Sequence, residues 1–330
     1  MEKKAKLVNK VKRLLKRLGC PRWLHHFGPK KYEFWQHAVA LLVKQECRLG
    51  YRWVSRLLKL LGFNVPTYSA LAKMIKRIPL VLWQNILNLT ANFRVHIVSI
   101  EGTGMSRPLP SPYYYRRIDK PYPVEIPLKL SMAVGTRRKK IMALRLRAKR
   151  AHDIRDARYL IKRLLTKPNK LVADKAYDAN WLHEFCHSRG IVTCIPQRNY
   201  GKSPYYRKTA RKRATQSYNK RTYGRREMSE SVFSSFKRRF GPSVSSLKIT
   251  TQRAEVYCKA IAYNIIYCFS GLFQRSRRPE LIRLLPVISF GFFILRISSI
   301  VGAMSARIPF LNFIFFFCPE TIMKGTLFVV

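Results

Sequence analysis

The chain has 330 residues, of which 65 are Lys or Arg and 16 are Asp or Glu, so its formal net charge is +49. Hydrophobic residues make up 47% of the sequence, which excludes a globally disordered chain and suffices for a packed core. A charge of this sign and size indicates a polyanionic partner: nucleic acid is the first candidate, and an anionic membrane surface is the alternative.

The seven cysteines are scattered, without a Cys-x-x-Cys pair, and the charged N-terminus has no continuous apolar core of a signal peptide. These features predict a cytoplasmic protein with free thiols. The cluster of His183, Cys186, His187 and Cys194 has two interpretations, a zinc site or one turn of an amphipathic helix. Its spacing matches no common zinc finger and favours the helix.

Residues 1–93 predict a helical DNA-binding domain. Two apolar stripes recur at helical spacing on either side of a break at Gly62, the first at Val54, Leu57, Leu58 and Leu61 and the second at Leu71, Met74, Ile75 and Ile78. Two short helices joined by such a turn resemble a helix-turn-helix, which makes Lys73, Lys76 and Arg77 candidate phosphate contacts. The alternative is a plain helical hairpin within an interaction domain.

Residues 94–272 predict an α/β domain with a mixed sheet. Strands are expected at 94–100, 128–136 and 140–148, then a helix at 153–165 with Asp153 as its N-cap. A strand ending near Asp174, a helix closed by Gly190, another strand and a long helix follow.

Residues 197–222 form a basic loop with interleaved tyrosines, containing nine Lys or Arg and no acid. The loop is interpreted either as a solvated, flexible connection or as a segment that tracks a phosphate backbone, and its uncompensated charge favours the second interpretation. The candidate DNA contacts in it are Arg207, Lys208, Arg211, Lys212 and Arg213.

The stretch RTYGRREMSESVFSSFKRRFG, residues 221–241, predicts one continuous amphipathic helix. At 100° per residue its polar face gathers four side chains within an arc of about 60°: Tyr223, Arg226, Glu230 and Lys237. An ion-pair ladder on a solvated surface is the alternative. The adjacent apolar arc is expected to bury against the sheet, and it contains Val232, Phe233, Phe236 and Phe240.

Acidic residues are scarce, and two of them, Glu101 and Asp174, are expected at strand ends, where a sheet fixes their position. Together with Glu230 they would supply oxygen ligands for hard divalent ions such as Mg²⁺ or Mn²⁺. Two such ions, about 3.5–4 Å apart, polarise a phosphate and activate the attacking oxygen. The alternative is that each carboxylate merely pairs with an Arg.

Three segments carry a resemblance to a known family: IEGTGMSRP (100–108), LVADKAYDANWL (171–182) and YGRREMSESVFSSFKRRFG (223–241). The sequence resembles DDE transposases of insertion sequences, in the subgroup with the Tyr-Arg-Glu-Lys signature and an RNase H-like catalytic domain. The resemblance implies that Glu101, Asp174 and Glu230 are the three catalytic and metal-binding acids. It also implies that Arg226 and Lys237 contact phosphates and that Tyr223 holds the DNA end.

The first acid departs from the family pattern, which has Asp before Gly-Thr-Gly where this chain has Glu101. The extra methylene displaces the carboxylate by about 1 Å, and such a displacement costs a large factor in rate unless the sheet compensates. Two functions therefore stay open. One is a transposase that cleaves element ends and transfers the strands with two divalent ions. The other is a weakened or inactive DNA-binding derivative.

The resemblance also implies double-stranded DNA, both element ends and target, as the partner, a homodimer on that DNA, and a place in the cytoplasm on the nucleoid. Residues 273–330 depart from the family as a hydrophobic C-terminal extension. Arg296 and Arg307 divide residues 284–318 into apolar blocks of about ten to twelve residues, shorter than the about 18–20 of a transmembrane helix. This length favours a divergent or read-through extension over a membrane segment.

Overall fold

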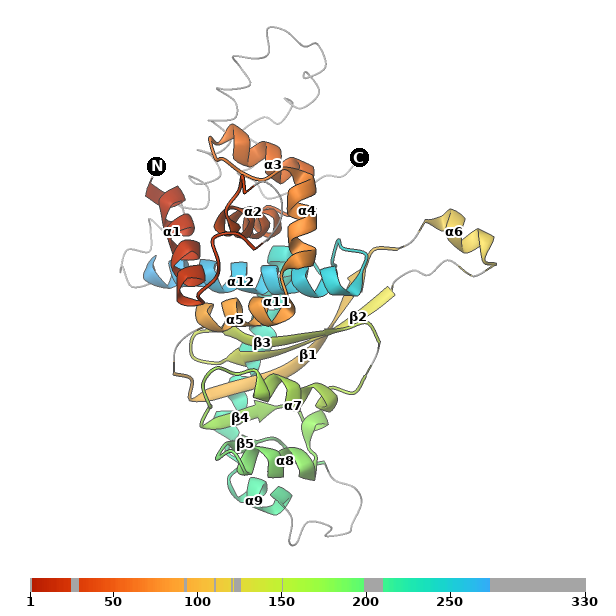
Figure 1. The fold of residues 1–330 in the computed structure, drawn as a ribbon. Coiled ribbons are helices and arrows are strands. Elements are labelled where there is room, and N and C mark those ends of the chain that lie inside the picture. Colours follow the sequence, from red (N-terminus) through yellow and green to blue (C-terminus); the bar gives the residue numbers. More distant parts are fainter. Residues whose placement is uncertain are drawn as a thin grey trace, which may run out of the picture. The chain divides into compact units, whose positions relative to one another are not determined.

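The computed structural model describes residues 2–24, 30–91, 94–109, 111–119, 121, 126–149, 151–198 and 210–273 (Figure 1). The chain divides into two compact units, Met1–Cys268 and Phe269–Val330. The description below concerns the first unit. Apart from Phe273, the predicted extension at 273–330 lies outside the described residues, and so do Arg207 and Lys208 of the basic loop.

Five helices precede the sheet: α1 (Glu2–Arg17), α2 (Phe34–Glu46), α3 (Tyr51–Leu60), α4 (Tyr68–Arg77) and α5 (Leu80–Thr90). Helices α3 and α4 contact each other, and the chain turns after α3 at Gly62, whose positive φ of 76° suits a residue without a side chain. Thr67 caps the start of α4 by accepting a hydrogen bond from the Ala70 amide. The apolar stripes face inward, since Val54 and Leu71 are fully buried.

The sheet contains five strands: β1 (Ile97–Arg107), β2 (Ile126–Gly135), β3 (Lys140–Arg147), β4 (Lys170–Ala173) and β5 (Val192–Cys194). Their order is β3-β2-β1-β4-β5. Strands β1, β2 and β3 are antiparallel neighbours, whereas β4 runs parallel to β1 and β5 runs parallel to β4. The mixed α/β sheet predicted from the sequence is therefore confirmed.

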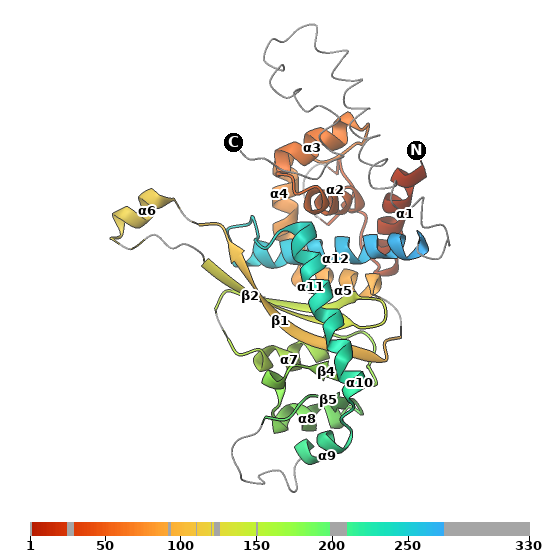
Figure 2. The ribbon, with the colours of Figure 1, turned by 180° about the vertical axis from the view of Figure 1, so that it is seen from behind.

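The remaining elements are α6 (Pro112–Arg117), α7 (Ile154–Lys162), the 3₁₀ turn η1 (Lys175–Tyr177), α8 (Asn180–His187), α9 (Ala210–Gln216), α10 (Lys220–Tyr223), the 3₁₀ turn η2 (Gly224–Arg226), α11 (Glu227–Phe240) and α12 (Ile249–Phe273). Helices α7 and α8 cover one face of the sheet (Figure 1), and α11 crosses the opposite face (Figure 2). No helix in the described ranges is both long and apolar enough to cross a membrane.

Alternation along β1 explains why helices cover both faces of the sheet. Val98 and Ile100 point into the core formed with α7 and α8, where they pack with Leu160, Leu171 and other buried residues. Ser99 points to the other face, where its hydroxyl donates to Ser229 Oγ of α11 at 3.0 Å. Odd-numbered side chains of β1 therefore face α11.

The predicted helix at 221–241 is not continuous, which corrects that expectation. The chain forms α10, then the turn η2, and only then α11 from Glu227. Gly224 opens the turn, and glycine favours the regular helix least among ordinary residues, while 3₁₀ turns are frequent at helix starts. The buried apolar arc agrees with the prediction, because Val232, Phe236 and Phe240 are buried. Because the turn η2 lies between Tyr223 and α11, the direction of the Tyr223 side chain relative to Glu230 and Lys237 cannot be calculated at 100° per residue.

Ion pairs and hydrogen bonds connect the end of α2 to the end of α11. The Arg239 guanidinium binds both carboxylate oxygens of Glu46, with Nε at 2.8 and 3.1 Å. In return, Arg48 Nε donates to the Arg239 carbonyl at 2.8 Å. Helix α12 is bonded to other elements: Asn264 Nδ2 donates to Thr90 Oγ1 in the last turn of α5 and to the Ile141 carbonyl of β3. The N-terminal helices are therefore bonded to the elements that carry and support the polar face of α11.

Candidate active site

Glu101 lies inside β1 rather than at a strand end, which corrects the sequence-based expectation. Antiparallel pairing with β2 continues from Val98 to Arg107, and Glu101 lies opposite Met132. The parallel pairing with β4 stops earlier, at Ile100 opposite Ala173. Glu101 is therefore the first residue of β1 beyond the end of β4, on an edge that the shorter strand leaves open.

Asp174 follows β4 directly and so lies beside Glu101 in the continuation of the same register. Its exposed side chain caps the turn η1, with Oδ1 accepting from the Lys175 amide at 2.7 Å. Two carboxylates thus end up side by side at the carboxyl end of the parallel strand pair, although they are far apart in the sequence. The parallel pairing of β1 and β4 is what places these two acids beside each other at the sheet.

Arg226 of the turn η2 connects Glu101 to the third predicted acid. One guanidinium nitrogen lies 3.0 Å from Glu101 Oε1, and the other lies 2.5 Å from Glu230 Oε1. The Ser229 hydroxyl donates to Glu101 Oε2 at 2.5 Å. Both oxygens of Glu101 are therefore bonded, and its side chain is only 19% exposed, compared with 50% for Glu230.

Glu101, Asp174 and Glu230, with Arg226 between two of them, are called the acidic site below. Burial raises the pKa of Glu101, and the nearby carboxylates of Glu230 and Asp174 raise it further, against the opposing effects of Ser229 and Arg226. Glu230 and Asp174 are thus both close enough to influence Glu101. A positive charge beside carboxylates stabilises their ionised forms, and the Arg226 guanidinium supplies such a charge to Glu101 and Glu230.

The donor chemistry of the acidic site fits a hard divalent ion, because every candidate ligand is a carboxylate oxygen. Within the described ranges, however, no three His, Cys, Asp or Glu side chains lie close enough together to hold one ion. Arg226 accounts for the spacing of Glu101 and Glu230, since its guanidinium lies between them. His183, from the zinc interpretation, binds Asp178 and Thr193 instead of a metal cluster.

Gly102, next to Glu101, occupies a place where no side chain fits. A Cβ atom there would lie 2.7 Å from Asp153 Oδ1, on the face opposite the acidic site. Asp153 begins α7 but makes no side-chain cap, contrary to the prediction, because its carboxylate pairs with Lys129 of β2. The glycine after the first acid therefore allows α7 to approach β1 closely.

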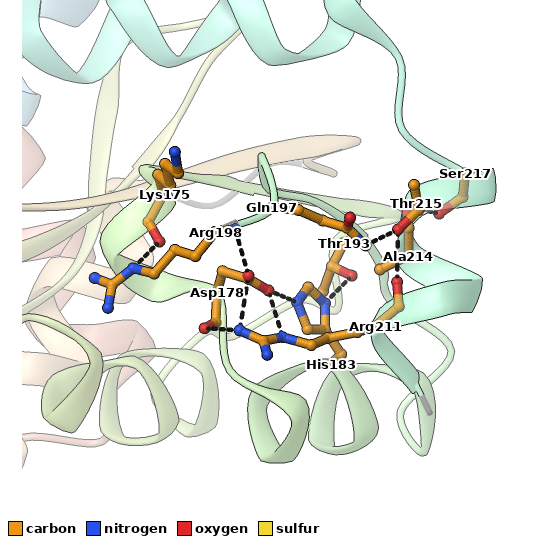
Figure 3. Close-up of polar contacts among 10 residues, drawn as sticks. All are labelled: Lys175, Asp178, His183, Thr193, Gln197, Arg198, Arg211, Ala214, Thr215 and Ser217. Atoms are coloured by element: carbon orange, nitrogen blue, oxygen red, sulfur yellow. Dashed lines mark hydrogen bonds and ion pairs between the residues drawn. The ribbon is translucent and has the colours of Figure 1, made fainter. Parts of the chain in front are cut away.

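Sequence reasoning missed a second acidic centre, Asp178 at the end of η1. Its side chain is fully buried and is bonded by four groups (Figure 3). The donors are the Arg198 amide at 2.8 Å, Arg211 Nε at 3.0 Å, Arg211 Nη2 at 2.8 Å and His183 Nε2 at 3.0 Å. His183 Nδ1 also bonds Thr193 Oγ1 of β5 at 2.7 Å. Asp178, His183, Thr193, Arg198 and Arg211 are called the Asp178 network.

Burial alone would raise the pKa of Asp178, but hydrogen bonds from His183, Arg198 and Arg211 outweigh it and hold that pKa below its ordinary value. Asp178 is therefore charged and fully paired in the folded chain. The scarcity of acids was the signal that would have found it, because each of the 16 carboxylates in so basic a chain is a candidate anchor.

The predicted DNA contacts fall in different places. Lys73, Lys76 and Arg77 are exposed on α4, and Lys212 and Arg213 are exposed on α9. Arg211, in contrast, is bound to Asp178 and its side chain is only 13% exposed, so the structure places it inside the fold rather than on a phosphate-binding surface. Tyr223 is half-buried beside Tyr218, and Lys237 is half-buried on α11.

Residues 97–265, more than half of the chain, match the family described as "Transposase DDE domain". The chain belongs to this family of transposases, DNA-cleaving and DNA-transferring enzymes that generally use divalent metal ions. No curated protein matches the sequence. A solved structure of the piggyBac transposase synaptic complex with hairpin DNA is 9% identical, with a TM-score of 0.42 over 81% of this chain and 72% of that chain.

Proposed function

We propose that the chain is a transposase of the subgroup with the Tyr-Arg-Glu-Lys signature, which cuts DNA at the ends of an insertion sequence and joins the freed 3′-hydroxyls to target DNA. The acidic site is the observation that carries this proposal: Glu101 on β1 and Asp174 directly after β4 both follow the last residue pair of these two strands, and Glu230 faces Glu101 across Arg226. The family match supports the reaction class.

The proposed architecture follows the sequence-based domains: a helical DNA-binding domain at 1–93, an RNase H-like catalytic domain at 94–272 and an extension at 273–330. The strand order, with antiparallel β1 to β3 and parallel β1, β4 and β5, supports the RNase H-like assignment. We further propose that the protein acts as a homodimer on double-stranded DNA, in the cytoplasm on the nucleoid and without membrane attachment.

Glu101, Asp174 and Glu230 would hold Mg²⁺ or Mn²⁺, which we propose to be two ions. When bound, such ions polarise the scissile phosphate and activate the attacking water or 3′-hydroxyl. Arg226 is already held at the acidic site by two carboxylates and is proposed to stabilise negative charge on the phosphate. Lys237 lies seven residues beyond Glu230 on α11, about 10 Å along the helix axis, and is proposed to bind the flanking DNA backbone.

A catalytically weakened DNA-binding derivative is the second candidate. Two observations favour it: the first acid is the longer Glu101, and Arg226 forms ion pairs with both Glu101 and Glu230 in the structure. In that case the chain would bind the same DNA ends without cutting them.

A cleavage assay separates the two functions. The full chain is incubated with duplex DNA from the flanks of its own gene, where inverted repeats are expected. Cutting at the repeat ends is expected with Mg²⁺ or Mn²⁺ and is expected to stop when EDTA removes the metal. Retarded DNA that is cut under neither condition supports the derivative, and cutting that survives EDTA contradicts the metal-binding role of the acids.

The exposed charges of α4 predict a salt-dependent contribution to DNA binding. Each of Lys73→Ala, Lys76→Ala and Arg77→Ala is expected to weaken binding and to reduce the slope of log affinity against log salt by about 0.9, the value for one phosphate contact. Fluorescence anisotropy at several salt concentrations measures the slope. Lys162→Ala on α7, also exposed, is the matched control and is expected to leave the slope unchanged. If all four variants keep the wild-type slope, the prediction that α4 contacts DNA is wrong.

A further inference from the structure

The turn that carries Asp174 has a second acid at its other end. Asp174 begins the turn η1 and accepts from the Lys175 amide, and the Tyr177 amide donates to the Asp174 carbonyl at 2.9 Å. The Asp178 amide closes the turn on the Lys175 carbonyl at 3.1 Å. The exposed acid and the buried acid therefore share one hydrogen-bonded turn of backbone.

The buried end of this turn is fixed from several directions. Asp178 accepts bonds from α8 through His183, from α9 through Arg211 and from the chain after β5 through the Arg198 amide (Figure 3). Arg211 also donates to the Asp178 carbonyl at 2.8 Å, so it binds both the side chain and the backbone of Asp178. Bidentate pairing of Arg with a buried carboxylate is among the strongest polar contacts in proteins.

A further bond reaches the residue beside Asp174. Arg198 Nε donates to the Lys175 carbonyl at 2.9 Å, while the Arg198 amide donates to Asp178. Arg198 thus bonds both the first residue of η1 and the acid that ends it. Arg198 and Arg211 also belong to the basic loop predicted at 197–222, so its described residues on both sides are attached to the Asp174 turn.

We infer that Asp178 is a positioning residue for Asp174, and that Arg198 and Arg211 use it to hold the metal-binding turn in place. The inference rests on the proposed function, because it assigns the network to the same acidic site. Hydrogen bonds that orient metal ligands from behind are worth about 10–100-fold in metal affinity, whereas a purely structural network changes stability alone. The two roles therefore differ in the response to metal.

Arg198→Ala is the central variant, because it removes the bond to the Lys175 carbonyl and keeps the Arg198 amide on Asp178. The rise in melting temperature of the full chain is measured against Mn²⁺ concentration, without DNA, so that activity plays no part. Arg198→Ala is expected to raise the Mn²⁺ concentration for half-maximal stabilisation about 10-fold. Lys220→Ala, which removes an equal charge from the exposed start of α10, is expected to match the wild type.

Asp178→Asn and Arg198→Lys complete the series. Asp178→Asn is expected to raise the Mn²⁺ concentration for half-maximal stabilisation at least as much as Arg198→Ala does. It is also expected to lower the melting temperature without metal, because Arg211 loses its buried charged partner. Arg198→Lys keeps a donor and is expected to restore part of the response. If Asp178→Asn does not fold, Arg198→Ala and Arg198→Lys alone decide the question.

Failure of the inference and failure of the proposed function give different results. If Mn²⁺ stabilises the wild type and Asp174→Asn abolishes that effect, but Arg198→Ala responds like the wild type, the positioning role is wrong and the metal site stands. If Mn²⁺ stabilises neither the wild type nor Asp174→Asn, the proposed metal site itself is wrong.

Discussion

Glu230→Gln is expected to lower DNA cleavage about 10³-fold while the fold and DNA binding stay intact. Metal ions stabilise the charge of a phosphoryl transition state by several kcal/mol, and each 1.36 kcal/mol is a factor of ten in rate. Glutamine keeps the shape of the side chain but lacks the charge that holds the ion. Because Glu230 is half exposed, the fold does not depend on its charge. The single-turnover rate on element-end DNA, with saturating Mn²⁺, is the measurement.

Glu227→Gln is the matched control, since it makes the same chemical change in the first turn of the same helix at an exposed position. Its cleavage rate is expected to stay within a factor of about two of the wild type, since surface substitutions change free energies by less than about 0.5 kcal/mol. Full cutting by Glu230→Gln, or equal losses in both variants, would show that Glu230 is not a ligand of the catalytic metal.

Glu101→Asp is expected to lower cleavage about 10²-fold, although aspartate is the residue that the family pattern leads one to expect. In this chain both oxygens of Glu101 are bonded, one to Arg226 and the other to Ser229. Loss of a methylene withdraws the carboxylate by about 1 Å from both partners, and a misplacement of that size costs about 10²-fold in rate. The same single-turnover assay provides the comparison.

The opposite outcome is equally informative. If Glu101→Asp cuts faster than the wild type, the longer side chain is a defect, and the weakened derivative becomes the better description of this chain. Glu184→Asp, at an exposed position on α8, controls for the loss of a methylene and is expected to have no effect.

Periodicity predicted the elements but not their limits. The β-branched run at 94–100 indicated a strand, yet β1 extends to Arg107, because Gly102 to Arg107 gain regular pairing with β2 despite weak strand propensity. That extension moved Glu101 from a strand end into a strand. In the same way, the apolar arc of α11 followed from spacing, whereas the turn η2 depends on local geometry at Gly224 that a helical wheel does not represent.

The meeting of Glu101, Asp174 and Glu230 was predicted from residue type and resemblance, and the register of β1 and β4 explains how two of them come together. The partners of these acids were not predictable in the same way. Ser229 has no motif of its own and becomes a donor to Glu101 only because α11 crosses β1 at Ser99. Arg211 was interpreted as a surface cation, since nothing in its sequence neighbourhood indicates the buried Asp178.

The bonds between Glu46, Arg48 and Arg239 bear on how this gene could be recombined with its relatives. They join the chain around the end of α2 to the last turn of α11, so the N-terminal helices and the part of the chain that matches the transposase domain are not interchangeable parts. A chimaera that exchanges residues 1–93 for those of another transposase would leave Arg239 without its carboxylate. Successful swaps should therefore need compensating changes at the far end of the gene.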